Sequence, residues 1–517
     1  MSDLVAGIDL GTQSLRVLVY DPARRAALAL TSAPLDLISG ADGSREQLAA
    51  WWLQALHVCF DAIPRAVRAR IAALAVSGQQ HGFVPVAADG RVLAPVKLWC
   101  DTSTERECGE IMRAVGGREA CIALAGNPVL PGYTASKLRW TRQHRPDAYR
   151  AMSTVLLPHD YLNFHLTGER WCEQGDASGT GWMDVRTRRW SPALLAAIDA
   201  DRDLAPCLPP LLPAHALVPL RPAIADALGL PRSACVGAGS GDNMMAALGT
   251  GCVEPGRATL SLGTSGTLFA HAAQPAVDAE GRWAAFCAFE GGWLPLVCTM
   301  NCTVATETVA TLCGHDARAG DALLAGTVPG AGGLTLLPFF NGERTPDLPA
   351  ARGGVFGLEP GNATPAHLHR AAMEGATFAL RHGADALHGA ASRAHGVQGQ
   401  RITLTGGGAR SAAWRQMVAD VFEAQVEVPR QTEGAAFGAA LAALWALEHA
   451  QRPQTTLAEV VGAHLEFDDA LTAVPAPESV EMYRAPYARF LRLLDTYRAL
   501  YAAPQAGAAD STFGAAA

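Results

Sequence analysis

The two halves of the chain open with the same local pattern, and this pattern most constrains the fold. An apolar segment at residues 4–9 runs into a polar turn at 11–14 and resumes at 15–20. Two apolar segments joined by a glycine-containing turn predict a β-hairpin with a polar tip. Residues 258–269 repeat the arrangement around a turn at 263–267. Recurrence of this kind indicates that each half is built similarly.

The length of the chain agrees with two units. A hydrophobic core stops growing at roughly 250–300 residues, so 517 residues predict two domains with separate cores. The hydrophobic fraction of 49% and the charged fraction of 17% are ordinary for a folded protein. We place the boundary near Glu254, giving domains at 1–254 and 255–500. The Ala- and Gly-rich segment 501–517 is predicted to be a flexible tail.

Charge, cysteine usage and the first residues argue against several classes of function. A net charge of -8 without a Lys/Arg block argues against nucleic acid or an anionic membrane as partner. The twelve cysteines are scattered, and the spacing of Cys298 and Cys302 is not that of a zinc site, so free thiols are expected. The acidic start, without an apolar leader, predicts a cytoplasmic protein. Residues 434–447 are too few to span a bilayer and predict a buried helix.

Further apolar patterns place secondary structure around the motifs. Thr364 is a plausible N-cap, with Pro365 in the first turn, for a long helix that reaches about Ala390. The Pro-rich stretch 206–219 is expected to be irregular. Other strands are predicted at 71–77, 235–239 and 401–405, and other helices at 135–143, 243–248 and 412–422.

Three glycine-containing loops could bind phosphate. The turns at 9–12 and 262–267 offer backbone N–H groups and hydroxyls where the main chain can approach an anion closely. Residues 406–411 join a predicted strand to a predicted helix, which is a context for nucleotide binding. This last loop has neither the lysine and spacing of a P-loop nor the glycine pattern of a dinucleotide fingerprint. Each could also be an ordinary hairpin tip or turn.

Two carboxylates stand beside these loops. Asp242 lies at a predicted strand-to-helix turn, where it could deprotonate an attacking hydroxyl or merely cap the helix. Asp9 lies beside Gly11, where it could orient water on Mg²⁺ or act as an Asx-turn residue. Gln80 and His81 lie between two predicted strands and could recognise hydroxyl groups, although a lone histidine at a strand end is usually structural.

The order of these segments resembles the FGGY family of carbohydrate kinases over nearly the whole chain. The segments that carry the resemblance are IDLGTQS at 8–14, SGQQHG at 77–82, GYTASKLRW at 132–140, LLPHDYL at 156–162, GSGDN at 239–243, LSLGTSG at 260–266, NGERTP at 341–346, GGVFGL with HLHRAAMEG within 353–375, and LTGGGARS at 404–411.

The resemblance implies an α/β fold of two actin-like, ribonuclease-H-like domains flanking a catalytic cleft, with sugar held mainly by the first domain and Mg-ATP by the second. It implies that Asp242 is the general base and that Asp9 holds Mg²⁺ through water. Sugar contacts would come from Gln80, His81, Asp242 and Asp101. Nucleotide contacts would come from Gly11, Thr12, Gln13, Thr264, Gly407, Gly408 and Ala409.

The reaction that the resemblance implies is ATP-dependent phosphorylation of a ketopentose, D-xylulose in the first place. Ribulose, glycerol and gluconate are the alternative acceptors. A regulator on the same scaffold, such as a chaperone ATPase or a sugar-sensing repressor, is a rival, but the chain has neither a further substrate-binding domain nor a basic helix-turn-helix. Closure of the two domains on sugar is expected, and a homodimer is left open.

Overall fold

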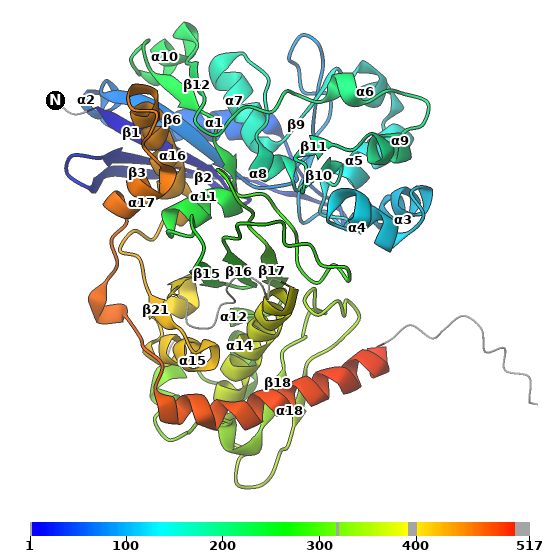
Figure 1. Cartoon of the computed structure of the whole chain (residues 1–517), viewed down its shortest axis with the longest axis vertical. Helices are drawn as coiled ribbons and strands as arrows, with labels where there is room; N and C mark the ends of the chain where they lie inside the picture. Colours follow the sequence, from blue (N-terminus) through cyan, green and yellow to red (C-terminus); the bar gives the residue numbers. More distant parts are fainter. Residues whose placement is uncertain (1–2, 317–319, 391–400, 502–517) are drawn as a thin grey trace, which may run out of the picture.

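The computed structural model describes residues 3–316, 320–390 and 401–501. Two β-sheets with flanking helices form the upper and lower halves of the molecule in Figure 1. The flexible tail predicted at 501–517 lies outside the described residues, apart from Tyr501.

The first sheet contains an antiparallel meander joined to parallel strands. The meander is β1 (Leu4–Leu10), β2 (Ser14–Asp21) and β3 (Ala26–Pro34), which confirms the predicted hairpin. Next to β1 lies the parallel strand β6 (Ile71–Gly78), which also pairs in parallel with β13 (Cys235–Gly237) and β14 (Ser240–Gly241). The short strand β12 (Leu217–Pro219) pairs with β13 at one edge, so the prediction of irregular structure over 206–219 is wrong at its end.

Both faces of this first sheet are buried. Side chains of a strand alternate between the two faces, so β1 contributes to a core on each side. Leu4, Ala6, Ile8 and Leu10 of β1 belong to a core that includes residues of α1 (Ala49–Asp61) and α7 (Pro158–Thr167). Val5, on the opposite face, belongs to a core with α11 (Asp242–Gly249) and α16 (Gly434–Gln451). A strand buried on both faces reads as a continuous apolar run, which is how residues 4–8 read in the sequence.

The second sheet repeats this plan. Its meander is β15 (Arg257–Leu262), β16 (Gly266–Ala270) and β17 (Leu296–Thr299), and β20 (Arg401–Thr405) lies parallel to β15, followed by β21 (Gln425–Glu427). The helices α14 (Pro365–Ala390), α15 (Ala412–Phe422) and α18 (Pro477–Tyr501) belong to this half. The predicted long helix and its Thr364 cap are confirmed, since the Thr364 hydroxyl accepts a hydrogen bond from the His367 N–H.

One helix connects the halves. Although α16 follows β21 in the sequence, it packs on β1 of the first sheet and on α11. Glycine permits this close approach: a Cβ on Gly7 would lie 1.8 Å from the Ala436 carbonyl oxygen, and one on Gly438 would lie 1.7 Å from that of Met245. The proposed boundary at residue 254 divides the sequence. The helix α16 lies beyond this boundary in the chain, yet it covers one face of the first sheet.

A group of helices forms a lobe beside the first sheet, at the right of the upper half of Figure 1. They share a small core of their own and include α3 (Glu105–Ala114), α4 (Arg118–Ala125), α5 (Thr134–His144), α6 (Pro146–Ala151) and α9 (Pro192–Ile198). All twelve cysteines are free thiols. Within the described ranges, no helix combines the length and the apolarity that a membrane crossing requires.

Candidate active site

The predicted site residues of the first half, except Asp101, lie at or just after the ends of three neighbouring strands. Asp9 of β1 and Ser240 of β14 are both register partners of Ser77 in β6. The three strands run parallel, so the residues after them, at Gly11, Gln80 and Asp242, emerge at one edge of the sheet. Ligands of α/β sheets bind at this carboxyl edge.

Asp9 is a buried carboxylate with an altered proton affinity. One of its oxygens accepts a hydrogen bond from the Ser77 hydroxyl at 2.9 Å. Burial raises the pKa of Asp9 to about 6, although Ser77 and the nearby Arg16 oppose this rise. A cation beside Asp9 would therefore stabilise its charged form.

Asp242 begins α11 and does not cap it. Its carboxylate accepts a hydrogen bond from the N–H of the next residue, Asn243, at 2.9 Å. The Asn243 amide also donates to the side-chain oxygen of Gln80 at 2.8 Å, which links Gln80 to the start of α11. Burial, with the neighbouring charges of Asp9 and Asp176, raises the pKa of Asp242 to about 7. This is the pKa range in which a carboxylate serves as a base near neutral pH.

His81 is held in an unusual backbone conformation. Its φ of 67° lies in the left-handed region, which costs free energy for a residue with a side chain. The amino group of Lys137, whose pKa burial lowers to about 7, donates hydrogen bonds to the carbonyl oxygens of His81 and Gly132, both at 2.7 Å. Burial lowers the pKa of His81 to about 3, so the imidazole is neutral. Its Nδ1 has no hydrogen-bond partner among the described residues.

Aromatic rings from both halves enclose His81. Tyr133 lies 4.8 Å and Phe286 5.7 Å from its ring centroid. Phe286 comes from the segment between β16 and β17 of the second sheet, and neighbouring residues of that segment bond to the first half. The Asn127 side chain exchanges two hydrogen bonds with the Ala285 backbone, at 2.9 and 2.7 Å.

The loop after β1 is fixed by a chain of side-chain hydrogen bonds. The Thr12 hydroxyl donates to Gln79 at 3.0 Å and accepts from the Trp99 indole at 2.9 Å. The side chain of Gln47 donates to the Thr12 carbonyl oxygen at 2.8 Å. Gln13, the next residue, is exposed. The loop is thus rigid at Thr12 and open to solvent at Gln13.

The predicted nucleotide loops of the second half also meet at one sheet edge. Register pairing of β15 with β20 places the loop containing Thr264 beside the loop that begins at Gly406. Gly406 has a φ of 84°, and its Cβ would lie 2.6 Å from the Leu262 carbonyl oxygen, so only glycine fits there. Gly407 is exposed with open space beside it, whereas Gly408 and Ala409 are buried against the sheet. The exposed backbone at Gly407 leaves room for a ligand.

Asp101 is engaged in structural contacts. Both of its oxygens are occupied, by the Arg45 N–H and the Lys97 ammonium on one and by the Ser103 N–H and hydroxyl on the other. The side chain is fully buried. These contacts account for Asp101 without a ligand.

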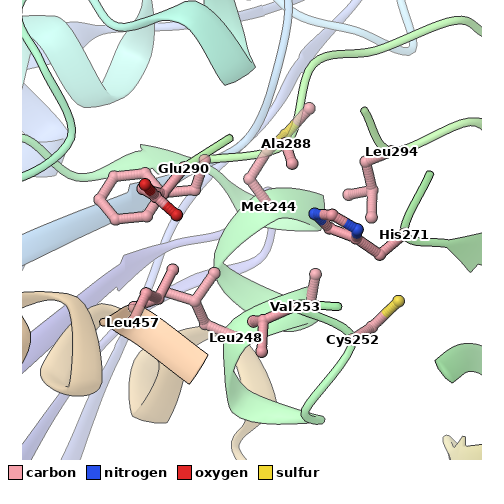
Figure 2. A pocket seen from close by; sticks show the side chains of 11 residues that line it. Met244, Leu248, Cys252, Val253, His271, Ala288, Glu290, Leu294 and Leu457 are labelled. Atoms are coloured by element: carbon pink, nitrogen blue, oxygen red, sulfur yellow. The ribbon is translucent and has the colours of Figure 1, made fainter. Parts of the chain in front are cut away.

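A small pocket lies apart from these strand ends, where α11, α17 (Leu457–His464) and residues 288–294 meet (Figure 2). Met244, Leu248 and Leu457 give it an apolar lining, with His271 and Glu290 as its polar side chains. No residue that we predicted for the site lines it.

Sequence reasoning did not assign roles to several residues around the site. Tyr133, Lys137 and His159 lie inside the segments GYTASKLRW and LLPHDYL, so those segments were a signal for them. Asp176 and Phe286 had no such signal, because one lies in the four-residue helix α8 (Gln174–Ala177) and the other in a long connection.

Two sheets of matching strand order, with polar loops and buried carboxylates at their strand ends, define a two-domain actin-like α/β protein. Family models for the N-terminal and C-terminal domains of the FGGY family of carbohydrate kinases match residues 4–249 and 258–447. The chain therefore belongs to this family and is a carbohydrate kinase, which confirms the resemblance found in the sequence.

Individual relatives are similar over almost their whole length. A xylulose kinase of Haemophilus influenzae is 38% identical, covering 94% of this chain and 98% of the relative, and one of Escherichia coli is 34% identical, covering 96% and 98%. The crystal structure of a xylulose kinase from Rhodospirillum rubrum has a TM-score of 0.85 at 28% identity and covers 96% and 99%.

Proposed function

We propose that this kinase transfers the γ-phosphoryl group of ATP to D-xylulose and releases D-xylulose 5-phosphate and ADP. The observation that carries the proposal is the linked group of Asp242, Asn243 and Gln80 at the carboxyl edge of the first sheet, beside Asp9. The activity of the relatives from Haemophilus influenzae and Escherichia coli supports xylulose as the acceptor.

Asp242 acts as the general base in this proposal. Its pKa of about 7 leaves much of it ionised at neutral pH and still able to accept a proton. The terminal hydroxyl oxygen of the sugar bonds to the γ-phosphorus, the bond from that phosphorus to its bridging oxygen breaks, and ADP leaves. The hydroxyl proton passes to Asp242. In phosphoryl transfer most of the rate acceleration comes from positioning and charge neutralisation.

Sugar hydroxyls bind to Gln80 and His81 in this proposal. The Gln80 side-chain nitrogen and the His81 Nδ1 are buried, and neither has a partner among the described residues. Burying a polar group without a partner costs about 1–3 kcal/mol, which a hydroxyl ligand would recover. The neutral imidazole can donate or accept a hydrogen bond without adding charge. The contacts already made by Asp101 favour a supporting role for it.

ATP binds to the loops at Gly11–Gln13, Thr264 and Gly407–Ala409, with the two halves closing over it. The residues present fit Mg²⁺, because the Asp9 and Asp242 carboxylates are buried together and the charge of Asp9 raises the pKa of Asp242. Asp9 would hold the ion through water. When bound, Mg²⁺ neutralises charge on the transferred phosphoryl group.

A coupled ADP-release assay tests the proposal with D-xylulose, D-ribulose, L-ribulose, glycerol and gluconate. We expect kcat/KM to be highest for D-xylulose, and Asp242→Ala to lower kcat roughly 10²–10⁴-fold, the usual contribution of a general base. Asp226→Asn, at an exposed ion pair with Arg232, is the control and should leave kcat unchanged.

Three results would contradict parts of the proposal. Preference for another acceptor would retain the kinase reaction and refute the sugar assignment. ATP hydrolysis that no sugar stimulates would favour the alternative function, a regulator on the same scaffold. An Asp242→Ala variant within a few fold of the unmodified enzyme would refute the base assignment.

A further inference from the structure

A buried charge cluster lies beneath the strand that leads to Asp242. His159 of α7 and Asp176 of α8 are both fully buried, and their Nδ1 and Oδ2 atoms are 2.7 Å apart. The other ring nitrogen of His159 lies 3.2 Å from Asp160. Burial by itself would lower the pKa of His159, but the Asp160, Asp176 and Glu173 carboxylates around it outweigh burial and raise it. A protonated His159 therefore binds Asp176 as an ion pair.

Asp176 is also linked to β14, the strand that leads to Asp242. Glu173 accepts hydrogen bonds from the Gly175 and Asp176 N–H groups, at 2.7 and 2.6 Å, and from the Ser240 hydroxyl at 2.6 Å. One carboxylate thus caps α8 and binds β14. Because Asp242 directly follows β14, the contact between α8 and β14 also helps to hold Asp242 in place.

The second oxygen of Asp176 points toward the active site. Asp176 Oδ1 is buried and has no hydrogen-bond partner among the described residues. It lies 3.1 Å from the point where a Cβ on Gly241 would stand, and the Gln80 side chain lies 2.6 Å from the same point. Glycine at 241 therefore leaves room for both the Asp176 carboxylate and the Gln80 side chain next to Asp242.

We propose that Asp176 is a positioning residue for the kinase reaction. His159 orients the Asp176 carboxylate, which places a negative charge beside the turn that carries Asp242. Nothing in the mechanism above uses this pair, and the inference rests on the proposed role of Asp242. The groups that face Asp242 are Asp9 from β1, Asp176 from α8 and Asn243 from α11. Of these, Asp9 and Asp176 carry charge, and both disfavour ionisation of Asp242.

Two variants of equal chemistry separate the positioning role from general structural damage. Asp176→Asn and Asp160→Asn each remove one carboxylate from His159 while keeping a hydrogen-bond acceptor. Only Asp176 lies beside Gly241, whereas Asp160 accepts from the Leu157 N–H at the start of α7. Asp160→Asn is therefore the matched control.

The measurement is the pH profile of kcat/KM for D-xylulose between pH 5 and 9, with thermal melts of each variant. The acid limb is the fall of kcat/KM at low pH. Removing the Asp176 charge should move this limb toward lower pH by about one unit, because Asp242 then ionises more readily. Asp160→Asn should move it by less than about 0.3 unit. If Asp176→Asn does not fold, Asp176→Ser gives the same test, since the smaller side chain also removes the charge.

An acid limb that stays in place in the Asp176 variant, or that moves equally in both variants, overturns the inference. Failure of the proposed function would look different. In that case the unmodified enzyme would show no acid limb, or Asp242→Ala would stay active, whatever the Asp176 variant does.

Discussion

At the scale of single residues, the activity of the enzyme should follow the ionisation of Asp242. The base works only when deprotonated, and its pKa is raised to about 7. We therefore expect kcat/KM to level off above about pH 7, to fall about tenfold per pH unit below it, and to fall more steeply below about pH 6, where Asp9 also becomes protonated. The ionisation of His81 should not affect kcat/KM above pH 5, because the pKa of His81 is lowered to about 3.

Steady-state kinetics over pH 5–9 check this expectation. The residual activity of Asp242→Asn should lose the fall near pH 7, since the amide does not titrate, and keep only a fall below about pH 6, where Asp9 becomes protonated. A limb that persists unchanged in this variant would assign the titration to another group.

Lys137 should control sugar binding through the backbone of His81. Lys137→Met removes the hydrogen bond to the carbonyl oxygen of the left-handed His81 and the one to Gly132, and each such hydrogen bond contributes about 0.5–1.5 kcal/mol. We expect the KM for D-xylulose to rise about tenfold or more. The KM for ATP should change by no more than about twofold, because the proposed nucleotide loops are elsewhere.

Arg142→Gln is the control for Lys137→Met. Arg142 lies on the same helix, α5, and forms ion pairs with Asp201, which is exposed, and with Asp199, both away from His81. Its replacement should alter neither KM. Equal rises in both KM values for Lys137→Met would point to loss of structure and would reject the specific role.

Individual residues differ in how far the sequence could reveal them. The turn at Gly11 and the carboxylates Asp9 and Asp242 could be found because glycines and strand ends mark them locally. Asp101 shows the limit of this reasoning: its segment is a loop, and its partners Arg45 and Lys97 meet it only in the fold. Asp176 and Phe286 approach the site through tertiary packing, which no local pattern records.

At the scale of elements, the contact between α11 and α16 should depend on the absence of a side chain at residue 438. A Cβ there would lie 1.7 Å from the Met245 carbonyl oxygen, and overpacking of a buried contact costs typically about 1–3 kcal/mol. Gly438→Ala should therefore lower the melting temperature by several degrees. It should also lower kcat, because α11 carries Asp242.

Gly462→Ala is the opposite case on the neighbouring helix α17. A Cβ at residue 462 meets no atom within 4 Å, so replacing glycine inside this helix should stabilise it by about 0.5–1 kcal/mol. Calorimetry of both variants makes the comparison. A Gly438→Ala protein as stable as the unmodified one would show that the helices can separate without cost.

Most elements could be predicted because their patterns are local. The hairpin tip, the apolar runs of β1 and β15 and the cap at Thr364 each lie within a few residues of the element that they define. The partner of α16 could not be predicted. Its sequence is apolar on all sides, so it gives no indication of which sheet it covers.

At the scale of the whole molecule, the two halves should unfold together. One core combines Val5 and Ala73 of the first sheet, Met244 of α11, and Phe286 and Leu441 from the second half of the chain. Unfolding either half would expose this shared core. We expect one calorimetric transition whose van't Hoff and calorimetric enthalpies agree, whereas two resolved transitions would contradict this coupling.

The placement of α16 also bears on how the protein is made. A ribosome releases the strands of the first sheet early, but the helix that covers one face of that sheet begins at Gly434. A nascent chain that ends before this point exposes apolar side chains of β1, β2 and β6, among them Val5, Leu18 and Ala75. Synthesis at about 5–20 residues per second leaves this face uncovered for many seconds. Chaperones that bind exposed apolar strands therefore have a defined target on this chain, and it disappears when α16 packs on the sheet.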